Sequence, residues 1–210
     1  MLKDIKRSTR LTRKILEELR DHTPFTVVGA FTGIILMILF LSSNLSSKTS
    51  YTIFYTLHPL HVLVSALVTA SMYELHVGGN FKLWVLIIIG YVGSIGIATL
   101  SDSLIPYIGE SLLNLPNRSM HLGFIEEWWL INPLALIGIL IAYFKPATKL
   151  PHYGHVLLST WASLFHIIMA LGSSLSLLTY IVILFCLFIS VWIPCCISDI
   201  VFPLLFIKEN

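Results

Sequence analysis

The chain alternates long apolar stretches with short polar connections, which is the pattern of a protein that crosses a lipid bilayer several times. A helix that spans a bilayer needs about 20 mostly apolar residues. The apolar stretches cover roughly residues 24–43, 52–75, 82–100, 128–144, 153–172 and 175–197. The sequence therefore predicts an all-α integral membrane protein with six transmembrane helices, of which the fourth is short.

The composition supports this class. Apolar residues make up 56% of the chain and charged residues only 11%, with a mean hydropathy of +0.86, whereas soluble domains carry about 25% charged residues. The lipid bilayer is the first partner that we expect. The net charge of +2 is too small to indicate a nucleic-acid partner, and a homodimer remains an open alternative.

The basic residues predict which loops face the cytoplasm, because cytoplasmic loops carry the excess of Lys and Arg. Of the 13 basic residues, only Lys48 and Arg118 fall in the alternate set of loops. Both termini are therefore expected in the cytoplasm. Residues 1–22 combine apolar side chains with seven of the basic residues, which favours an amphipathic helix on the membrane surface.

A polar motif in the second predicted helix returns in the fifth. The sequence HPLHVLVS begins at His58, and HYGHVLLS begins at His152. A Ser-Asp pair that ends at Asp102 likewise returns as a pair that ends at Asp199. The chain is therefore expected to contain an internal repeat that bears the same polar residues twice.

Each copy of the repeat contains three predicted helices, so the second copy crosses the membrane in the opposite sense. This arrangement predicts two inverted three-helix repeats, related by a pseudo-twofold axis in the membrane plane. We expect the repeats at residues 23–107 and 126–210, joined by an extracytoplasmic loop at residues 108–125. Pro59 favours a helix that begins near His58, and Pro106 marks an end or a break in the third helix.

The histidine motifs continue as polar stripes, because their positions fall three or four residues apart and share one helix face. Ionisable groups in hydrocarbon cost roughly 2 to 3 kcal/mol each, so they turn toward a partner helix or an aqueous path. The predicted pathway residues are Ser65, Thr69, Met72, His76, Ser159 and Ser163. The alternative is that the stripes are packing contacts between helices.

Two imidazoles at positions i and i+3 lie within reach of one metal ion, and a carboxylate from a neighbouring helix can complete such a site. This donor set suits Zn, Fe, Mn, Ni or Co without choosing among them. The candidate metal ligands are His58, His61, Asp102, Glu126, Glu127, His152, His155, His166 and Asp199. The inverted arrangement predicts two separate clusters, with the first histidine pair toward the outside and the second toward the cytoplasm.

The sequence thus predicts a membrane transporter for a divalent transition-metal cation, with proton coupling as an option, in which two repeats rock against each other. An intramembrane metal-dependent hydrolase is the first alternative, with Asp102 or Asp199 as the base. A haem b electron carrier with axial histidines from two helices is the second. No nucleotide-binding or nucleophile motif is present in the sequence, which argues against the enzyme classes that depend on one.

Overall fold

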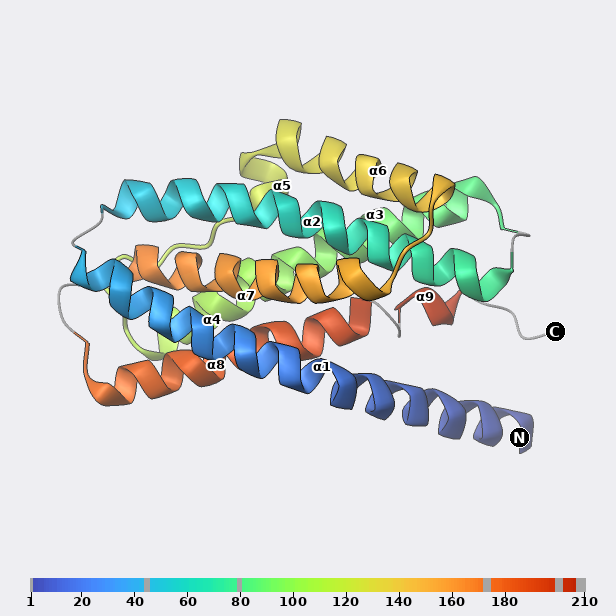
Figure 1. Cartoon of the computed structure of the whole chain (residues 1–210), viewed down its shortest axis with the longest axis horizontal. Coiled ribbons are helices and arrows are strands. Elements are labelled where there is room, and N and C mark those ends of the chain that lie inside the picture. The colour runs from blue at the N-terminus through green and yellow to red at the C-terminus, as the bar shows by residue number, and fades with distance from the viewer. Residues whose placement is uncertain (1, 44–45, 79–80, 172–174, 199–201, 207–210) are drawn as a thin grey trace.

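The computed structural model describes residues 2–43, 46–78, 81–171, 175–198 and 202–206. In this part of the chain, long antiparallel helices form a bundle (Figure 1). The elements are α1 (Leu2–Ser42), α2 (Ser47–Val77), α3 (Leu83–Thr99), the π-helical turn η1 (Leu100–Leu104), α4 (Ile105–Leu112), α5 (Gly123–Glu126), α6 (Trp128–Phe144), α7 (Lys149–Ala170), α8 (Leu177–Cys196) and α9 (Phe202–Leu205).

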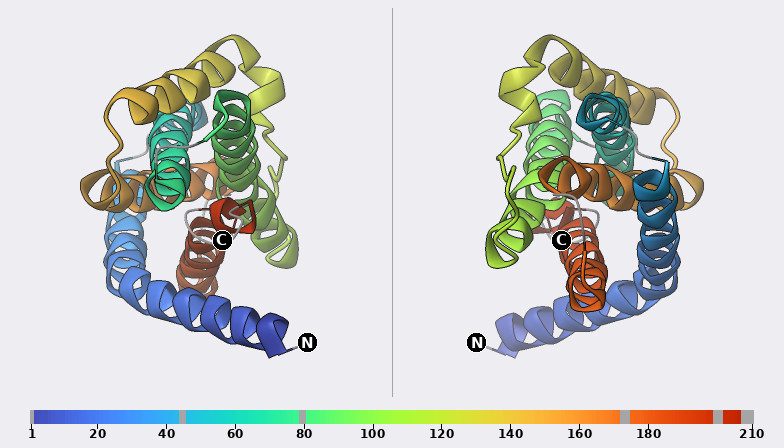
Figure 2. Two further views of the ribbon diagram at one scale, coloured as in Figure 1. Left: turned by 90° about the vertical axis from the view of Figure 1, so that its right-hand side faces the viewer. Right: turned by 90° about the vertical axis from the view of Figure 1, so that its left-hand side faces the viewer.

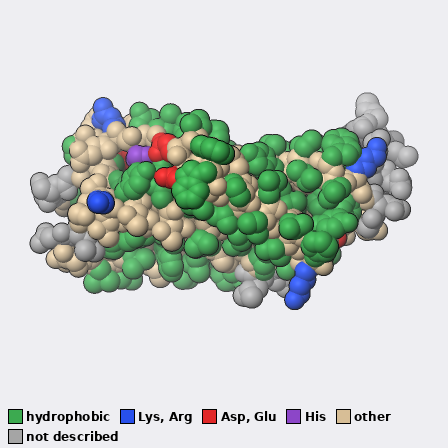
Figure 3. All heavy atoms as spheres, turned by 90° about the horizontal axis from the view of Figure 1, so that it is seen from above, with side chains coloured by type: hydrophobic (Ala, Val, Ile, Leu, Met, Phe, Trp, Pro, Cys, Tyr) green, Lys and Arg blue, Asp and Glu red, His purple; other side chains and the backbone are tan. Residues whose placement is uncertain are grey.

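Five helical segments of the described chain are long and apolar enough to cross a membrane. They are Thr23–Ser42, Ser47–Val77, Leu83–Leu112, Pro151–Ala170 and Leu177–Cys195. The apolar helix α6 is shorter, with 17 residues. Hydrophobic side chains cover most of the face seen in Figure 3, and Lys and Arg side chains lie near its two ends. The structure therefore agrees with a multi-pass helical membrane protein.

Three helix boundaries differ from those expected. Residues 2–22 continue into the first apolar segment as the single helix α1. Helix α2 begins at Ser47, where the Ser46 side chain accepts a hydrogen bond from the Thr49 N–H, so Pro59 lies inside the helix and does not start it. Membrane helices tolerate an interior proline because neighbouring groups satisfy the freed carbonyl. Helix α4 extends the third segment into the predicted loop.

Helices α2 and α7 lie side by side along the centre of the bundle (Figure 1). Helix α6 packs on the far side of α2, and α1 packs against α7 and α8, as the end-on views of Figure 2 show. Gly138 brings α6 close to α2, since a Cβ atom at this position would meet the Leu63 carbonyl oxygen and would lie 2.9 Å from the Ala66 Cβ. Small residues at such contacts let membrane helices approach closely.

The apolar core divides around the α2–α7 pair. Its larger part joins α1, α7 and α8 through residues such as Met37, Leu164 and Leu187. A second part joins α2, α3 and α6 through residues such as Leu86 and Ile139. The polar side chains of α2 and α7 lie between these two parts.

The bundle has two ends, each marked by a contact between connecting segments. At the α1–α2 end, α1 meets α2 near Ser46, and the connection from α4 to α5 runs past Tyr51, whose ring lies 6.0 Å from the ring of His121. At the α6–α7 end, the α6–α7 connection contacts the end of α2, where the Ala147 N–H donates to Ser71 Oγ at 3.1 Å.

Candidate functional site

Asp102 stands on η1, the π-helical turn between α3 and α4. The Ile105 N–H bonds to the Leu100 carbonyl, five residues back, and Pro106 in the next turn has no N–H to donate. Such single π-turns widen a helix and occur often at functional sites. Ile197 and Ser198 also have π-helical geometry, and Ser198 Oγ bonds to Thr69 Oγ1 at 2.9 Å.

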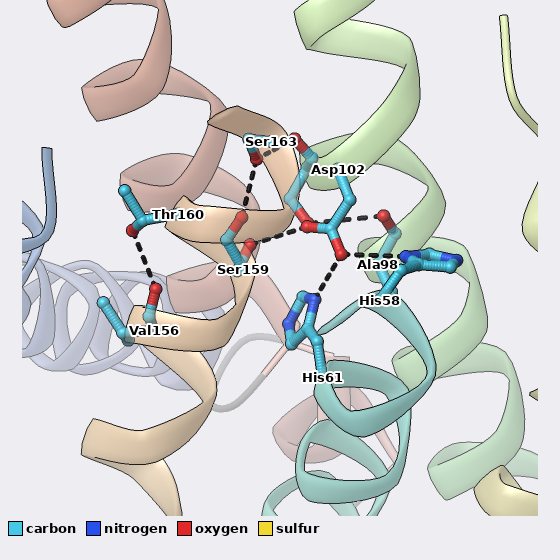
Figure 4. A network of polar contacts seen from close by, with 9 residues as sticks. His58, His61, Ala98, Asp102, Val156, Ser159, Thr160 and Ser163 are labelled. Carbon is cyan, nitrogen blue, oxygen red and sulfur yellow. Dashed lines mark hydrogen bonds and ion pairs between the residues drawn. The ribbon is translucent and has the colours of Figure 1, made fainter. Parts of the chain in front are cut away.

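Asp102 accepts hydrogen bonds at both carboxylate oxygens (Figure 4). Its Oδ2 atom lies 2.8 Å from Nδ1 of His58 and 2.7 Å from Nδ1 of His61. Its Oδ1 atom accepts from Ser101 Oγ at 2.7 Å and from Ser159 Oγ at 2.8 Å. Each Nδ1 carries the hydrogen, because an ionised carboxylate can only accept. One side chain thus joins η1, α2 and α7.

This His–Asp–His cluster, formed by His58, Asp102 and His61, is sealed inside the bundle, and at most 1% of each residue is exposed. With both imidazoles neutral it carries one negative charge, and an uncompensated buried charge costs several kcal/mol. A bound proton or metal cation neutralises that charge. His61 Nε2 is buried with no hydrogen-bond partner among the described residues, and a carboxylate on Nδ1 increases the basicity of such a nitrogen.

The second histidine motif adjoins the first. The ring centroids of His61 and His155 are 5.6 Å apart, and those of His155 and His152 are 5.2 Å apart. His155 is buried and His152 is partly exposed. The two histidine pairs are therefore not separated into distant clusters as expected, because α2 and α7 pack along their polar faces.

A second buried pair lies closer to the α1–α2 end. His166 Nδ1 on α7 is 2.6 Å from Glu110 Oε1 on α4, and the side chains are 1% and 0% exposed. Glu110 Oε2 and His166 Nε2 have no hydrogen-bond partner among the described residues. The ring of His121 lies 5.4 Å from the ring of His166, which links this pair to the surface.

Glu126 forms the partly exposed end of the same group. Burial acts to raise the pKa of Glu126, but hydrogen bonds from the Tyr55 hydroxyl, from His121 and from the Leu122 N–H, together with the charge of His121, hold the pKa below its ordinary value. The His121 Nδ1 to Glu126 Oε2 distance is 3.2 Å. These side chains are 20% and 36% exposed, so this end of the group reaches the surface of the bundle.

Phe54 separates the two buried groups. Its ring is fully buried, stacks on His58 with centroids 5.3 Å apart, and meets the edge of His166 at 5.4 Å. Gly123 covers His58 from α5, since a Cβ atom at Gly123 would lie 2.6 Å from His58 Nε2. The side chains of the two buried groups and of the histidines on either side of them form a single row, in which Phe54 is the one member without an ionisable group. In order, the row contains Glu126, His121, His166 with Glu110, Phe54, His58, Asp102, His61, His155 and His152.

The remaining predicted residues have varied positions. Ser163 Oγ donates to the carbonyls of Ser101 and Ser159, and Ser65 is buried beside the row. Met72 is partly buried and His76 is exposed at the end of α2, where its Nδ1 lies 2.8 Å from the Met72 carbonyl. Glu127 precedes α6 and is partly exposed. Asp199 lies outside the described residues.

Sequence reasoning missed Glu110 and Tyr55. An ionisable residue inside an apolar helix marks a functional site by default, and Glu110 follows the apolar stretch LIPYIG. The predicted third helix ended at residue 100, so Glu110 fell into the expected loop. The π-helical turn keeps the helix continuous to Leu112. The sequence did not reveal this continuity, so Glu110 was not recognised as a residue inside a helix.

The geometry favours proton and cation chemistry over nucleophilic catalysis. Ser159 donates its hydrogen to Asp102, so no histidine activates its oxygen as a nucleophile requires. Across the described residues, no three His, Cys, Asp or Glu side chains are grouped to hold a metal ion. His61 lies beside His155, and each belongs to a motif with a second histidine.

Comparisons of this chain with protein-family models, with curated proteins and with solved structures found no match. Its class therefore follows from its own fold and site. It is a multi-pass α-helical membrane protein. Within that class, its distinguishing feature is a row of ionisable side chains through the bundle, centred on the His–Asp–His cluster.

Proposed function

We propose that this protein is a membrane transporter that exchanges protons for a divalent transition-metal cation. The observation that carries the proposal is the row of ionisable side chains, which runs from partly exposed Glu126 to partly exposed His152 through the buried His–Asp–His cluster. Buried ionisable groups within membrane helices commonly mark ion paths and proton relays. The Phe54 ring interrupts the row at one place, and a purely structural role would not require ionisable groups on both sides of that ring.

Charge explains how protons and a metal cation would compete. The His–Asp–His cluster holds one negative charge, which one proton neutralises and which a divalent metal cation would exceed by one positive charge. His61 and His155 are the side chains from which a metal would displace protons. Imidazole nitrogens bind transition metals only when deprotonated. Metal binding at His61 and His155 would therefore release protons, which is the coupling that an exchanger needs.

The packing of the helices supports an inverted repeat and alternating access as part of this proposal. Helix α2 packs against α3, α6 and α7, whereas α7 packs against α8, α1 and α2. A pseudo-twofold axis would match α1 with α6, α2 with α7 and α3 with α8. Under this matching, the neighbours of α2 become the neighbours of α7. Rocking of α7 against α2 would bring His155 and His61 together as metal ligands and would open one end at a time.

The test is transport by purified protein in sealed vesicles that contain a pH indicator and a metal indicator. We expect uptake of at least one of Zn²⁺, Mn²⁺, Fe²⁺, Co²⁺ or Ni²⁺ with counterflow of protons. Asp102→Asn should abolish both fluxes, while Glu17→Gln, which removes a charge that Arg13 pairs on the exposed face of α1, should retain them. Absence of flux for every one of these ions in the wild type would remove the proposal.

A second candidate is an intramembrane metal-dependent hydrolase. It is favoured by one observation, namely that both histidine motifs meet at one level of the bundle, with His61 and His155 5.6 Å apart. A catalytic metal needs about three protein ligands and an open position for water. Elemental analysis separates the two candidates, since a hydrolase should retain about one equivalent of metal after dialysis whereas a transporter should release its cargo.

A further inference from the structure

The connection from α4 to α6 folds back into the bundle and does not stay at its end. Gly123 of α5 lies against His58, because a Cβ atom at Gly123 would be 2.6 Å from His58 Nε2. His58 follows Ser47, the first residue of α2, by about three helical turns, or about 16 Å along the helix. Helix α6 begins only after α5 and lies along only part of α2 (Figure 1). Nearer the α1–α2 end, the connection takes the place of a helix.

The backbone of this connection is weakly tied to the rest of the bundle. Residues 118–122 have no regular secondary structure, and the backbone of residues 118–121 makes no hydrogen bond to the described residues. The last tie before them is the Asn117 N–H, which donates to the Ala170 carbonyl at 3.2 Å. Segments with few backbone hydrogen bonds open at a lower free energy than packed helices. Residues 118–126, the α5 segment, are therefore suited to open while the long helices stay packed.

Two side chains of the α5 segment hold it against α2. The ring of His121 has its centroid 6.0 Å from that of Tyr51 and 6.2 Å from that of Tyr55. Glu126 accepts a hydrogen bond from the Tyr55 hydroxyl, and its other carboxylate oxygen accepts from the Leu122 N–H at 3.1 Å. The Tyr55 hydroxyl therefore links α2 to the same carboxylate that fixes the turn of α5.

The α5 segment covers the nitrogen of His58 that faces away from the His–Asp–His cluster. His58 Nδ1 lies 2.8 Å from Asp102 Oδ2, so Nε2 is the ring nitrogen that remains for a cation. The backbone of Gly123 approaches this nitrogen closely because glycine has no Cβ atom. A cation that arrives from the α1–α2 end on this side would have to displace the α5 segment before it could bind His58 Nε2.

We propose that the α5 segment is a gate at the α1–α2 end of the row, and that the hydrogen bond from Tyr55 to Glu126 holds this gate shut. Its use in transport rests on the proposed function, whereas its opening does not. A transporter that alternates access must close one end of its path while the other end is open. Loss of the Tyr55 hydrogen bond frees residues 118–126 to move away from α2, with Asn117 and the start of α6 as the fixed ends.

The rate at which a thiol reagent reaches position 58 tests the gate. The purified full chain carries His58→Cys, with its native cysteines replaced. We expect modification to be about tenfold faster or more when Tyr55→Phe is added, because a hydrogen bond to a charged group is lost. Tyr91→Phe is the matched control, since the Tyr91 hydroxyl donates to Asn132 at 3.0 Å and joins α3 to α6. This control should leave the rate unchanged.

Equal rates with and without Tyr55→Phe would overturn the gate. If His58→Cys does not fold, hydrogen exchange in the chain with its native histidines decides instead. The N–H groups of residues 125–127 bond to carbonyls within the α5 segment and should exchange about tenfold faster or more in Tyr55→Phe. Unchanged exchange there would equally overturn the gate.

Neither measurement uses vesicles, so the outcome is independent of the transport assay. A gate that Tyr55→Phe opens in a protein without any flux would remove the transporter and leave the gate in place. A protein with flux whose position 58 does not respond to Tyr55→Phe would leave the transporter in place and remove the gate.

Discussion

His61 of α2 and His155 of α7 lie with their ring centroids 5.6 Å apart in the interior of the bundle, although each belongs to a different copy of the same sequence motif. The contact arises because the two helices are antiparallel and meet along their polar faces. It makes the two motifs parts of one site.

Replacing Asp102 with Asn should abolish cation flux and lower the melting temperature. The carboxylate now accepts hydrogen bonds from two Nδ1–H groups and two hydroxyl groups. The amide nitrogen of Asn cannot accept a hydrogen bond, so it would leave some of these donors unsatisfied. Each unsatisfied buried donor costs roughly 1 to 3 kcal/mol. Thermal melts and vesicle flux measure the two effects. Flux equal to that of the wild type would mean that the His–Asp–His cluster is only structural.

Replacing His155 with Ala should reduce metal affinity and flux by at least about tenfold while changing stability little. Interhelical polar contacts in membranes are worth about 0.6 kcal/mol on average, whereas a lost metal ligand commonly costs far more in affinity. His61→Ala should lose affinity to the same extent, but it also removes a hydrogen bond to the buried Asp102 carboxylate, so it should lower stability as well. A loss of stability with unchanged affinity would show that these histidines only join α2 to α7.

Phe54→Leu should increase proton leak through vesicles in the absence of metal. The smaller side chain narrows the apolar separation between His166 and His58, against which the Phe54 ring now packs, and it avoids the cost of about 3 to 5 kcal/mol that Phe→Ala carries in a core. Phe40→Leu is the matched control, because Phe40 packs on Phe165 and is not a member of the row. Equal leak in both variants would contradict the barrier.

The group at Glu126 should make stability depend on acid pH. The pKa of Glu126 is held below its ordinary value, so its stabilising effect is fully present above the unfolded-state value of about 4.3 and is lost as the pH falls through the lower folded-state value. Glu126→Gln should therefore melt below the wild type at neutral pH, and the difference should shrink below about pH 4. A difference that does not depend on pH would indicate lost packing alone.

The ends of the bundle should face opposite sides of the membrane. In a background without Cys186, Cys195 and Cys196, a cysteine at position 48 or 118 should react with an impermeant thiol reagent from outside, and one at position 82 or 145 only after the membrane is opened. Lys48 lies in the first turn of α2 at the α1–α2 end, and Lys145 follows α6 at the other end. Labelling of positions 82 and 118 from the same side would contradict the predicted topology.

The sequence alone was sufficient for the helical membrane class and for the polar face of each of the helices α2 and α7. Apolar stretches of bilayer length and the three-to-four spacing of His58, His61 and Ser65 are local properties of the sequence. In a helix, this spacing places the three side chains on one face. The helix boundaries could not be predicted as well from the sequence. The capping bond of Ser46 and the π-helical turn at Asp102 depend on backbone geometry that composition does not encode.

Only the tertiary structure decided which of these residues meet. Inverted copies of a motif were expected to lie apart, but the depth of each histidine depends on how far α2 and α7 slide along each other, and that offset is set by packing across the whole bundle. The same packing placed Phe54 between His58 and His166 and paired Glu110 with His166. These contacts join residues distant in the chain, so no periodicity within a single helix could have specified them.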